Sequence, residues 1–189
     1  TISGENASSD DVRFNLDLPS TGAHETTITW IGGTYVEASG YVSRPADADH
    51  LDAITATISR GSASETKSFS LTVKRAYTIG WGNVQFPTSA SAQAGEPTTT
   101  IYGQVWVDGE TTAADAVPDL IAEVGYGALN SVPSGQDWVW SSAQFNPGHA
   151  GLNNDEYMGT LTVEHAGTYA YAYRYSGDDR RTWFYADTG

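Results

Sequence analysis

Apolar and polar residues alternate at a period of two in most segments of this chain. Residues 12–19 (VRFNLDLP) place an apolar side chain at every second position, and the turn-forming residues 20–25 (STGAHE) separate them from the next segment, 26–33 (TTITWIGG). Successive side chains of a β-strand point to opposite faces, so this pattern is typical of strands with one buried face. Segments with helical periodicity are nearly missing. The chain is therefore predicted to be all-β.

Further short strands follow in the first part of the chain. They are bounded by Gly, Pro, Ser or Asp and lie at residues 41–45 (YVSRP), 51–61 (LDAITATISRG) and 68–74 (SFSLTVK). Short strands with a turn about every ten residues are typical of an antiparallel sandwich. In the last segment alternate apolar residues point one way, as expected of a closing strand. We therefore expect an immunoglobulin-like (Ig-like) domain over residues 1–76.

The second part of the chain carries seven candidate strands, the number that an Ig-like or fibronectin-like sandwich needs. They lie at residues 77–87, 98–109, 120–127, 137–145, 156–163, 168–175 and 181–187. We therefore expect a second domain over residues 77–189. The predicted fold class is all-β, with two consecutive β-sandwiches, an Ig-like one followed by a fibronectin- or Ig-like one.

The charge of the chain excludes some classes of partner. Its net charge is −14, with only nine Lys and Arg residues, whereas binding to nucleic acid or to an anionic membrane needs clustered bases. Cysteine is absent, which excludes disulfides and zinc–thiolate sites. No apolar run approaches the roughly 20 residues of a membrane span. The N-terminal residues lack the pattern of a signal peptide, so we expect a mature fragment of a larger protein.

Four tyrosines occupy alternate positions of residues 168–175 (TYAYAYRY) and therefore share one face of a strand. The preceding turn is typical of the tyrosine corner of Ig-like sandwiches, which favours an inward Tyr169. Alternation then also directs Tyr171 and Tyr173 into the core. Trp183 and Tyr185 share one face of the partner strand and could pair across with these rings. The alternative, a row of sugar-stacking rings, would require small alanines to pack the core.

Other aromatic residues are candidates for an exposed platform. If Ile101, Val105 and Val107 face inward, then Tyr102 and Trp106 lie on the outer face, about 13 Å apart. Trp138 and Trp140 share a face opposite Val139 and follow a loop, where binding residues often lie. The alternative for all four rings is a second layer of core beneath adjacent loops.

A flat aromatic ring can bury the apolar C–H face of a sugar, while nearby polar side chains bind its hydroxyl groups. Asp137, Gln136 and Gln104 are close enough in sequence for that role. A neutral polysaccharide needs no basic patch, which agrees with the charge. The predicted ligand-binding residues are Tyr102, Trp106, Asp137, Trp138 and Trp140.

The sequence carries no constellation typical of an enzyme. The four histidines lie apart, without a nucleophile elbow, a zinc-binding helix or a phosphate loop. The acidic pairs Asp155–Glu156 and Asp178–Asp179 could hold Ca²⁺, but no EF-hand spacing occurs, which favours solvated turn residues. The same acids could in principle form a glycosidase pair, yet nothing places them at the required separation. We therefore assign no catalytic residue, no metal site and no cofactor.

Residues 10–75 resemble an atypical bacterial Ig-like domain that often stands beside catalytic domains in secreted glycosidases. The resemblance is carried by LDLP (16–19), TTITW (26–30), GYVSRP (40–45), ITATIS (54–59) and TKSFSLTV (66–73). Residues 31–39 (IGGTYVEAS) depart from the serine-rich turn that is usual in the family. The resemblance implies a spacer domain without catalytic residues.

Residues 79–189 are similar to a β-sandwich module attached to bacterial amylopullulanases and some other extracellular enzymes. The matching stretches are WGNVQFP (81–87), IYGQVWVDG (101–109), AEVGYG (122–127), NNDEYMGTLT (153–162), GTYAYAYRYS (167–176) and TWFYAD (182–187). The resemblance implies a secreted or cell-surface location, an α-glucan as ligand, and the catalytic domain of the same parent chain as a partner.

The resulting hypothesis is a non-catalytic accessory fragment of a secreted multidomain carbohydrate-active enzyme, which binds polysaccharide through exposed aromatic residues. The alternative is a pair of structural spacer or interaction modules with no ligand of their own.

Overall fold

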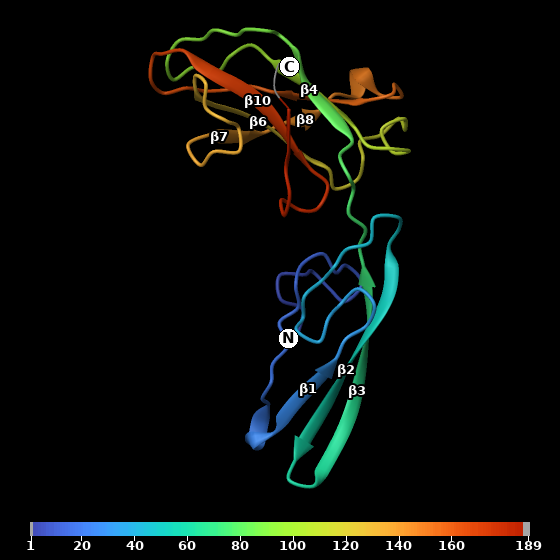
Figure 1. Cartoon of the computed structure of the whole chain (residues 1–189). Helices are drawn as coiled ribbons and strands as arrows, with labels where there is room; N and C mark the ends of the chain where they lie inside the picture. The colour runs from blue at the N-terminus through green and yellow to red at the C-terminus, as the bar shows by residue number, and fades with distance from the viewer. Residues whose placement is uncertain (1, 187–189) are drawn as a thin grey trace. The chain divides into compact units, whose positions relative to one another are not determined.

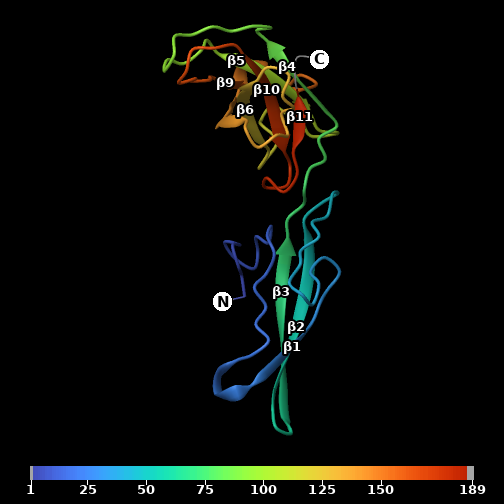
Figure 2. The ribbon, with the colours of Figure 1, turned by 60° about the vertical axis from the view of Figure 1, so that its left-hand side comes forward.

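The chain forms two compact units whose regular secondary structure is almost entirely β-strand (Figures 1 and 2). A computed structural model describes residues 2–186, and the two units are Thr1–Ala76 and Tyr77–Gly189. The helices within residues 2–186 are two short 3₁₀ turns, η1 (Ala23–Glu25) and η2 (Pro147–His149), and no helix there is long and apolar enough to cross a membrane. The expected all-β fold class is confirmed.

The N-terminal unit is built on one antiparallel sheet with the strand order β1-β2-β3. The strands are β1 (Thr27–Ile31), β2 (His50–Arg60) and β3 (Ala63–Val73). Ile54 on β2 lies opposite Phe69 on β3, and their shared face packs onto the core of the unit. The fully buried members of this core are Val12, Val36, Val42, Ile54 and Val73.

Two segments predicted as strands, 12–19 and 41–45, are largely irregular, so that prediction was wrong. They make only isolated bridges, Val12 with Val73 and Val42 with Val36. Near the start of the first segment, a side chain takes the place of a neighbouring strand. The buried Asn6 accepts hydrogen bonds through Oδ1 from the N–H groups of Arg13 (2.6 Å) and Phe14 (2.7 Å). Backbone groups bonded in this way need no sheet partner.

The turn after β1 is organised by one carboxylate. Asp52 accepts hydrogen bonds from the backbone N–H groups of Thr34 (3.0 Å), Tyr35 (2.8 Å), Val36 (2.9 Å) and Ala53 (2.9 Å). A Cβ atom at Gly33 would lie 1.9 Å from Asp52 Oδ1, so the glycine leaves room for the carboxylate. Burial alone would raise the pKa of Asp52, but these four bonds outweigh it and hold the pKa below its ordinary value.

The C-terminal unit is a sandwich of two four-stranded antiparallel sheets. One sheet has the order β11-β10-β6-β7 and the other the order β4-β5-β9-β8; Figures 1 and 2 label members of both. The bounds are β4 (Trp81–Phe86), β5 (Ile101–Trp106), β6 (Ile121–Ala128), β7 (Val139–Ser142), β8 (Gln144–Phe145), β9 (Asp155–Gly159), β10 (Tyr169–Ser176) and β11 (Phe184–Ala186).

Residues 77–186 form eight strands rather than the seven predicted for this unit, because the segment 137–145 divides between the sheets. Its first half is β7, which pairs with β6, and its second half is β8, which pairs with β9. Ala143 lies between them and still donates its N–H to Ala122 O of β6 (2.9 Å). The alternation of side chains continues through this segment, so the change of sheet leaves no mark on the sequence pattern.

Two of the four alternating tyrosines are fully buried in the core, as predicted. Tyr173 and Tyr175 stack with ring centroids 5.8 Å apart, and the Tyr173 hydroxyl donates to Ile101 O (2.6 Å). Burial raises the pKa of both phenols. Tyr169 is half-buried and donates its hydroxyl to His165 O (3.1 Å), which is the arrangement expected of a tyrosine corner.

The predicted pairing of Trp183 and Tyr185 with these rings was wrong by one residue. Phe184 lies opposite Tyr175, whereas Tyr185 lies opposite Arg174 on the outer face. There the Arg174 guanidinium lies 4.3 Å from the ring centroid of Trp140 and 3.9 Å from that of Trp183. Its Nε and Nη2 donate to the buried Glu123 (2.7 and 2.5 Å). Residues 183–185 are all aromatic, so their sequence is compatible with either Phe184 or its two neighbours facing the core. The register with β10 determines which of them does.

The Asp52 carboxylate leads to the first prediction. Asp52→Asn should lower the free energy of unfolding of the N-terminal unit by about 1–3 kcal/mol at pH 7, because a neutral amide has only one accepting oxygen for the four N–H groups. Since the pKa of Asp52 is depressed in the folded state, its stabilisation is present above the unfolded pKa of about 3.9 and is lost as the pH falls below it.

Urea unfolding of the full chain, followed through amide NMR signals of β1–β3, measures this difference. The gap between wild type and Asp52→Asn should narrow as the pH falls from 7 to about 3. Asp17→Asn is the control, because that exposed carboxylate makes no hydrogen bond or ion pair within residues 2–186. An equal gap at both pH values would contradict the role given to the ionised carboxylate.

The Arg174 stack leads to the second prediction. Arg174→Lys keeps the charge but loses the planar group between the two indoles, so the free energy of unfolding of the C-terminal unit should fall by about 1–2 kcal/mol. The same substitution at the exposed Arg60 serves as the control. Equal midpoints of thermal unfolding for the two variants would show that the stacking contributes nothing measurable.

Candidate functional site

The outer face of the β4-β5-β9-β8 sheet carries a group of aromatic and polar side chains. On β5 the residues Ile101, Gly103 and Val105 are buried, and the half-buried Tyr102 and Trp106 alternate with them on the opposite side. The strand register places their neighbours on the same face. We call this surface the Tyr102–Trp106 face; it consists of Trp81, Asn83, Phe86, Tyr102, Gln104, Trp106, Gln144, Glu156 and Met158.

The aromatic side chains of this face form two pairs at opposite ends of β5. Trp81 lies opposite Trp106, and Phe86 lies opposite Tyr102. Trp81 is 41% exposed and Phe86 is 59% exposed, so a substantial part of both rings contacts solvent. The spacing of four residues along β5 separates the two pairs by about 13 Å.

Local backbone features place Trp81 and Phe86, which the sequence analysis missed, on the Tyr102–Trp106 face. Val84 lies opposite Gly103 and Phe86 lies opposite Tyr102, so Gln85 is the extra residue of a β-bulge. The bulge turns Phe86 to the same face as Trp81. Trp81 itself could have been found from the alternation with the inward Val84, but a bulge depends on the partner strand and gives no sequence signal.

A row of polar side chains lies between the two aromatic pairs. Asn83, Gln104 and Glu156 lie side by side on three adjacent strands. Gln104 Nε2 is 3.3 Å from His149 Nε2, and the buried Glu156 accepts a 2.6 Å hydrogen bond from Asn146 Nδ2.

One polar atom in this row lacks a partner. Asn83 Oδ1 is buried and accepts no hydrogen bond from any residue within 2–186. A buried acceptor without a donor raises the free energy of the protein. Two aromatic pairs with amide and carboxylate groups between them suit a neutral, hydroxyl-rich chain.

The structure places the other predicted ligand-binding residues on the opposite sheet. Trp138 is 7% exposed, stacks on Trp140 at 5.4 Å, and donates its Nε1–H to Ser131 Oγ (2.9 Å). These indoles lie close over glycines of β6; a Cβ atom at Gly127 would approach Trp138 Nε1 to 2.5 Å. The pair therefore has a packing role on this sheet, and its role in ligand binding stays a prediction.

Asp137 is exposed beside this indole pair. Because β5 and β7 belong to different sheets, the structure does not bring Asp137, Trp138 and Trp140 together with Tyr102 and Trp106. The predicted ligand-binding residues thus fall into two separate groups, one on each outer face of the sandwich.

The acidic residues considered for Ca²⁺ make local hydrogen bonds. Asp155 is buried and accepts from the Val117 N–H (3.1 Å), and burial raises its pKa. Asp178 accepts from the Thr182 N–H (2.9 Å) and from the Ser176 hydroxyl (2.8 Å). In the described part of the chain, no three or more His, Asp or Glu side chains are grouped to hold a metal ion.

The chain matches known proteins in both of its units. Residues 1–76 match the family model described as the atrophied bacterial Ig domain. An amylopullulanase of Thermoanaerobacterium saccharolyticum is 31% identical over 156 residues, which cover 74% of this chain and 12% of the relative. For the amylopullulanase of Thermoanaerobacterium thermosulfurigenes the identity is 31% over 130 residues, covering 60% of this chain and 7% of the relative.

A third amylopullulanase, from Thermoanaerobacter thermohydrosulfuricus, is 28% identical over 127 residues, which cover 58% of this chain and 8% of that protein. The chain thus spans a small part of the length of each relative. Both resemblances expected from the sequence are confirmed: residues 1–76 match the atrophied bacterial Ig domain, and the chain is similar to a short segment of bacterial amylopullulanases.

Proposed function

We propose that this chain is a non-catalytic accessory segment of a larger secreted enzyme and that its C-terminal unit binds a polysaccharide on the Tyr102–Trp106 face. The observation that carries the proposal is the pair of exposed rings, Trp81 and Phe86, beside Trp106 and Tyr102 with a polar row between them. The segment of the relatives that this chain matches is too short to transfer their activity.

An α-glucan is the ligand that we expect first, because the curated relatives are named amylopullulanases. The acidic chain also favours a neutral polymer over a polyanion. The rings would stack on the apolar faces of successive sugar residues, while Asn83 and Gln104 would bond to hydroxyl groups between them.

The proposed benefit to the parent enzyme is a higher local concentration of substrate. A binding unit tethered to a catalytic domain turns each later encounter with the polymer into an intramolecular event. The N-terminal unit, which matches an Ig domain, would serve as the spacer between them. The catalytic domain of the same parent chain is thus the proposed partner, and the proposed location is outside the cell or on its surface.

The third prediction tests the face by affinity electrophoresis in gels that contain starch, pullulan, dextran or xylan. Wild-type chain should be retarded most by an α-glucan, and Trp81→Ala or Trp106→Ala should weaken binding at least about tenfold, equal to ~1.4 kcal/mol. The matched control is Tyr41→Ala, which removes a ring of 51% exposure from the N-terminal unit and should leave the retardation unchanged.

Two outcomes would contradict the proposal in different ways. Free migration in all four gels would favour the alternative function, a structural spacer without a ligand. The other outcome is that retardation persists in Trp81→Ala and Trp106→Ala but is lost in Trp140→Ala. If Trp140→Ala also keeps the unfolding midpoint of wild type, the binding site would be the Trp138–Trp140 pair.

A further inference from the structure

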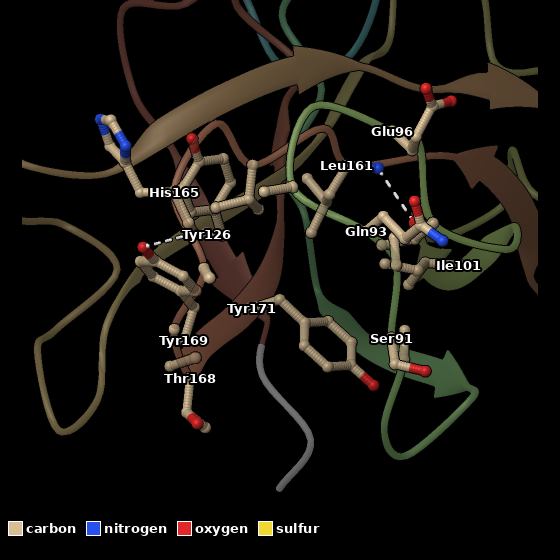
Figure 3. Close-up of a pocket in the computed structure, with 18 residues that line it drawn as sticks. Ser91, Gln93, Glu96, Ile101, Tyr126, Leu161, His165, Thr168, Tyr169 and Tyr171 are labelled. Carbon is tan, nitrogen blue, oxygen red and sulfur yellow. Dashed lines mark hydrogen bonds between the residues drawn. The ribbon is translucent and has the colours of Figure 1, made fainter.

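A cavity of about 440 Å³ opens at one end of the C-terminal sandwich, and Figure 3 shows the side chains that line it. The loop between β4 and β5 forms one wall, and the start of β10 with the turn before it forms another. Ile101 and Leu161 supply apolar surface, and the rings of Tyr126, Tyr169 and Tyr171 line it as well. A volume of this size is within the range of small-molecule sites, about 300–1,000 Å³.

The three tyrosine rings hold one another and the backbone in place. Tyr171 donates its hydroxyl to Pro87 O, and Tyr169 donates its hydroxyl to His165 O (3.1 Å). Tyr126 packs edge-on against Tyr169, with centroids 5.5 Å apart and an interplanar angle of 80°. The positions of two rings are therefore determined by the protein alone, which reduces the conformational entropy that a ligand would have to remove.

The wall opposite the rings alternates small and polar side chains over residues 90–94 (ASAQA). The alanines leave the space open, and Figure 3 shows Ser91 and Gln93 beside the cavity with Glu96 nearby. The side chains of Gln93, Glu96 and Thr168 make no hydrogen bond or ion pair within residues 2–186. They are free to bond to a ligand.

The chemistry of this lining selects one class of ligand. No Lys or Arg lines the cavity and Glu96 is its one carboxylate among residues 2–186, which disfavours an anionic ligand. A wholly apolar ligand would displace water from the polar groups without replacing its hydrogen bonds. A sugar residue combines an apolar ring face for the tyrosines with hydroxyl groups for the polar wall.

We propose that this cavity is a second carbohydrate site, which takes the terminal residues of a neutral oligosaccharide. A concave site with walls on two sides, partly open to solvent, favours the end of a chain, whereas the sheet surface of the Tyr102–Trp106 face can contact a chain anywhere along its length. The two sites are near each other at one end of β5, because Ile101 lines the cavity and Tyr102 follows it on the face. The inference shares with the proposed function the class of ligand, but it does not require binding on the face.

The fourth prediction is tested by NMR titration of the full chain with maltotriose. Amide signals of residues 90–96 and 165–171 should shift in a saturable manner. Ala92→Trp, which fills the cavity, should weaken binding at least about tenfold, and Gln93→Ala should weaken it by a smaller factor. Gln93 is exposed and makes no side-chain bond within the described residues, so this variant gives a readout that does not depend on refolding.

Two controls separate the cavity from the face. Ala114→Trp adds the same bulk to an exposed alanine outside the cavity and should leave maltotriose binding unchanged. Trp106→Ala should weaken retardation by polymer while maltotriose still binds as in wild type. Ala92→Trp should weaken maltotriose binding while the polymer still retards the chain. If the Tyr102–Trp106 face does not bind polysaccharide, the maltotriose titration still tests the cavity.

The inference is overturned if maltotriose, isomaltotriose, cellotriose and xylotriose all fail to produce saturable shifts at residues 90–96. It is equally overturned if Ala92→Trp binds maltotriose as wild type does. Shifts confined to the surroundings of Trp81 and Trp106 would assign the oligosaccharide to the face and leave the cavity without a role.

Discussion

The packing of β5 against the tyrosines of β10 is the contact on which the C-terminal unit depends. Gly103 permits it, because a Cβ atom at that position would lie 2.5 Å from Tyr173 Cγ. With Gly103 and its neighbours at i±2 directed inward, Tyr102 and Trp106 must point outward. The same strand register therefore determines both the core and the Tyr102–Trp106 face. A shift of β5 by one residue would turn its core side chains outward and its outer side chains inward.

Period-two patterning was sufficient to predict the β-class, the inward Tyr173 and the outward side of β5, since each follows from alternation within one strand. The pattern failed to predict features that depend on contacts with another segment of the chain. The bulge that turns Phe86 depends on β5, and the irregular path near Arg13 depends on the side chain of Asn6. The change of sheet at Ala143 depends on two partner strands at once. Such features require three-dimensional neighbours that alternation cannot supply.

The two outer faces of the sandwich use similar aromatic residues differently. On the β6–β7 side glycines lie next to the indoles, so Trp138 and Trp140 lie flat on the sheet and stack with each other, and Arg174 stacks on Trp140. On the β5 side the central neighbours are amides and a carboxylate, and Trp81 keeps an open ring. In both groups, the spacing in the sequence places the aromatic residues of a strand on one face. Whether a ring is packed or exposed depends on the residues next to it on the adjacent strands.

The crossing of the chain at Ala143 has a mechanical consequence. The peptide backbone passes directly from β7 in one sheet to β8 in the other, so the two sheets are joined by covalent bonds at this edge as well as by packing. A pull on β9 is transmitted through β8 to β7 along the main chain, and shear between the sheets has to stretch that short link before the layers can slide. Sliding of the two layers at this edge is therefore opposed by the main chain in addition to the side-chain packing between them.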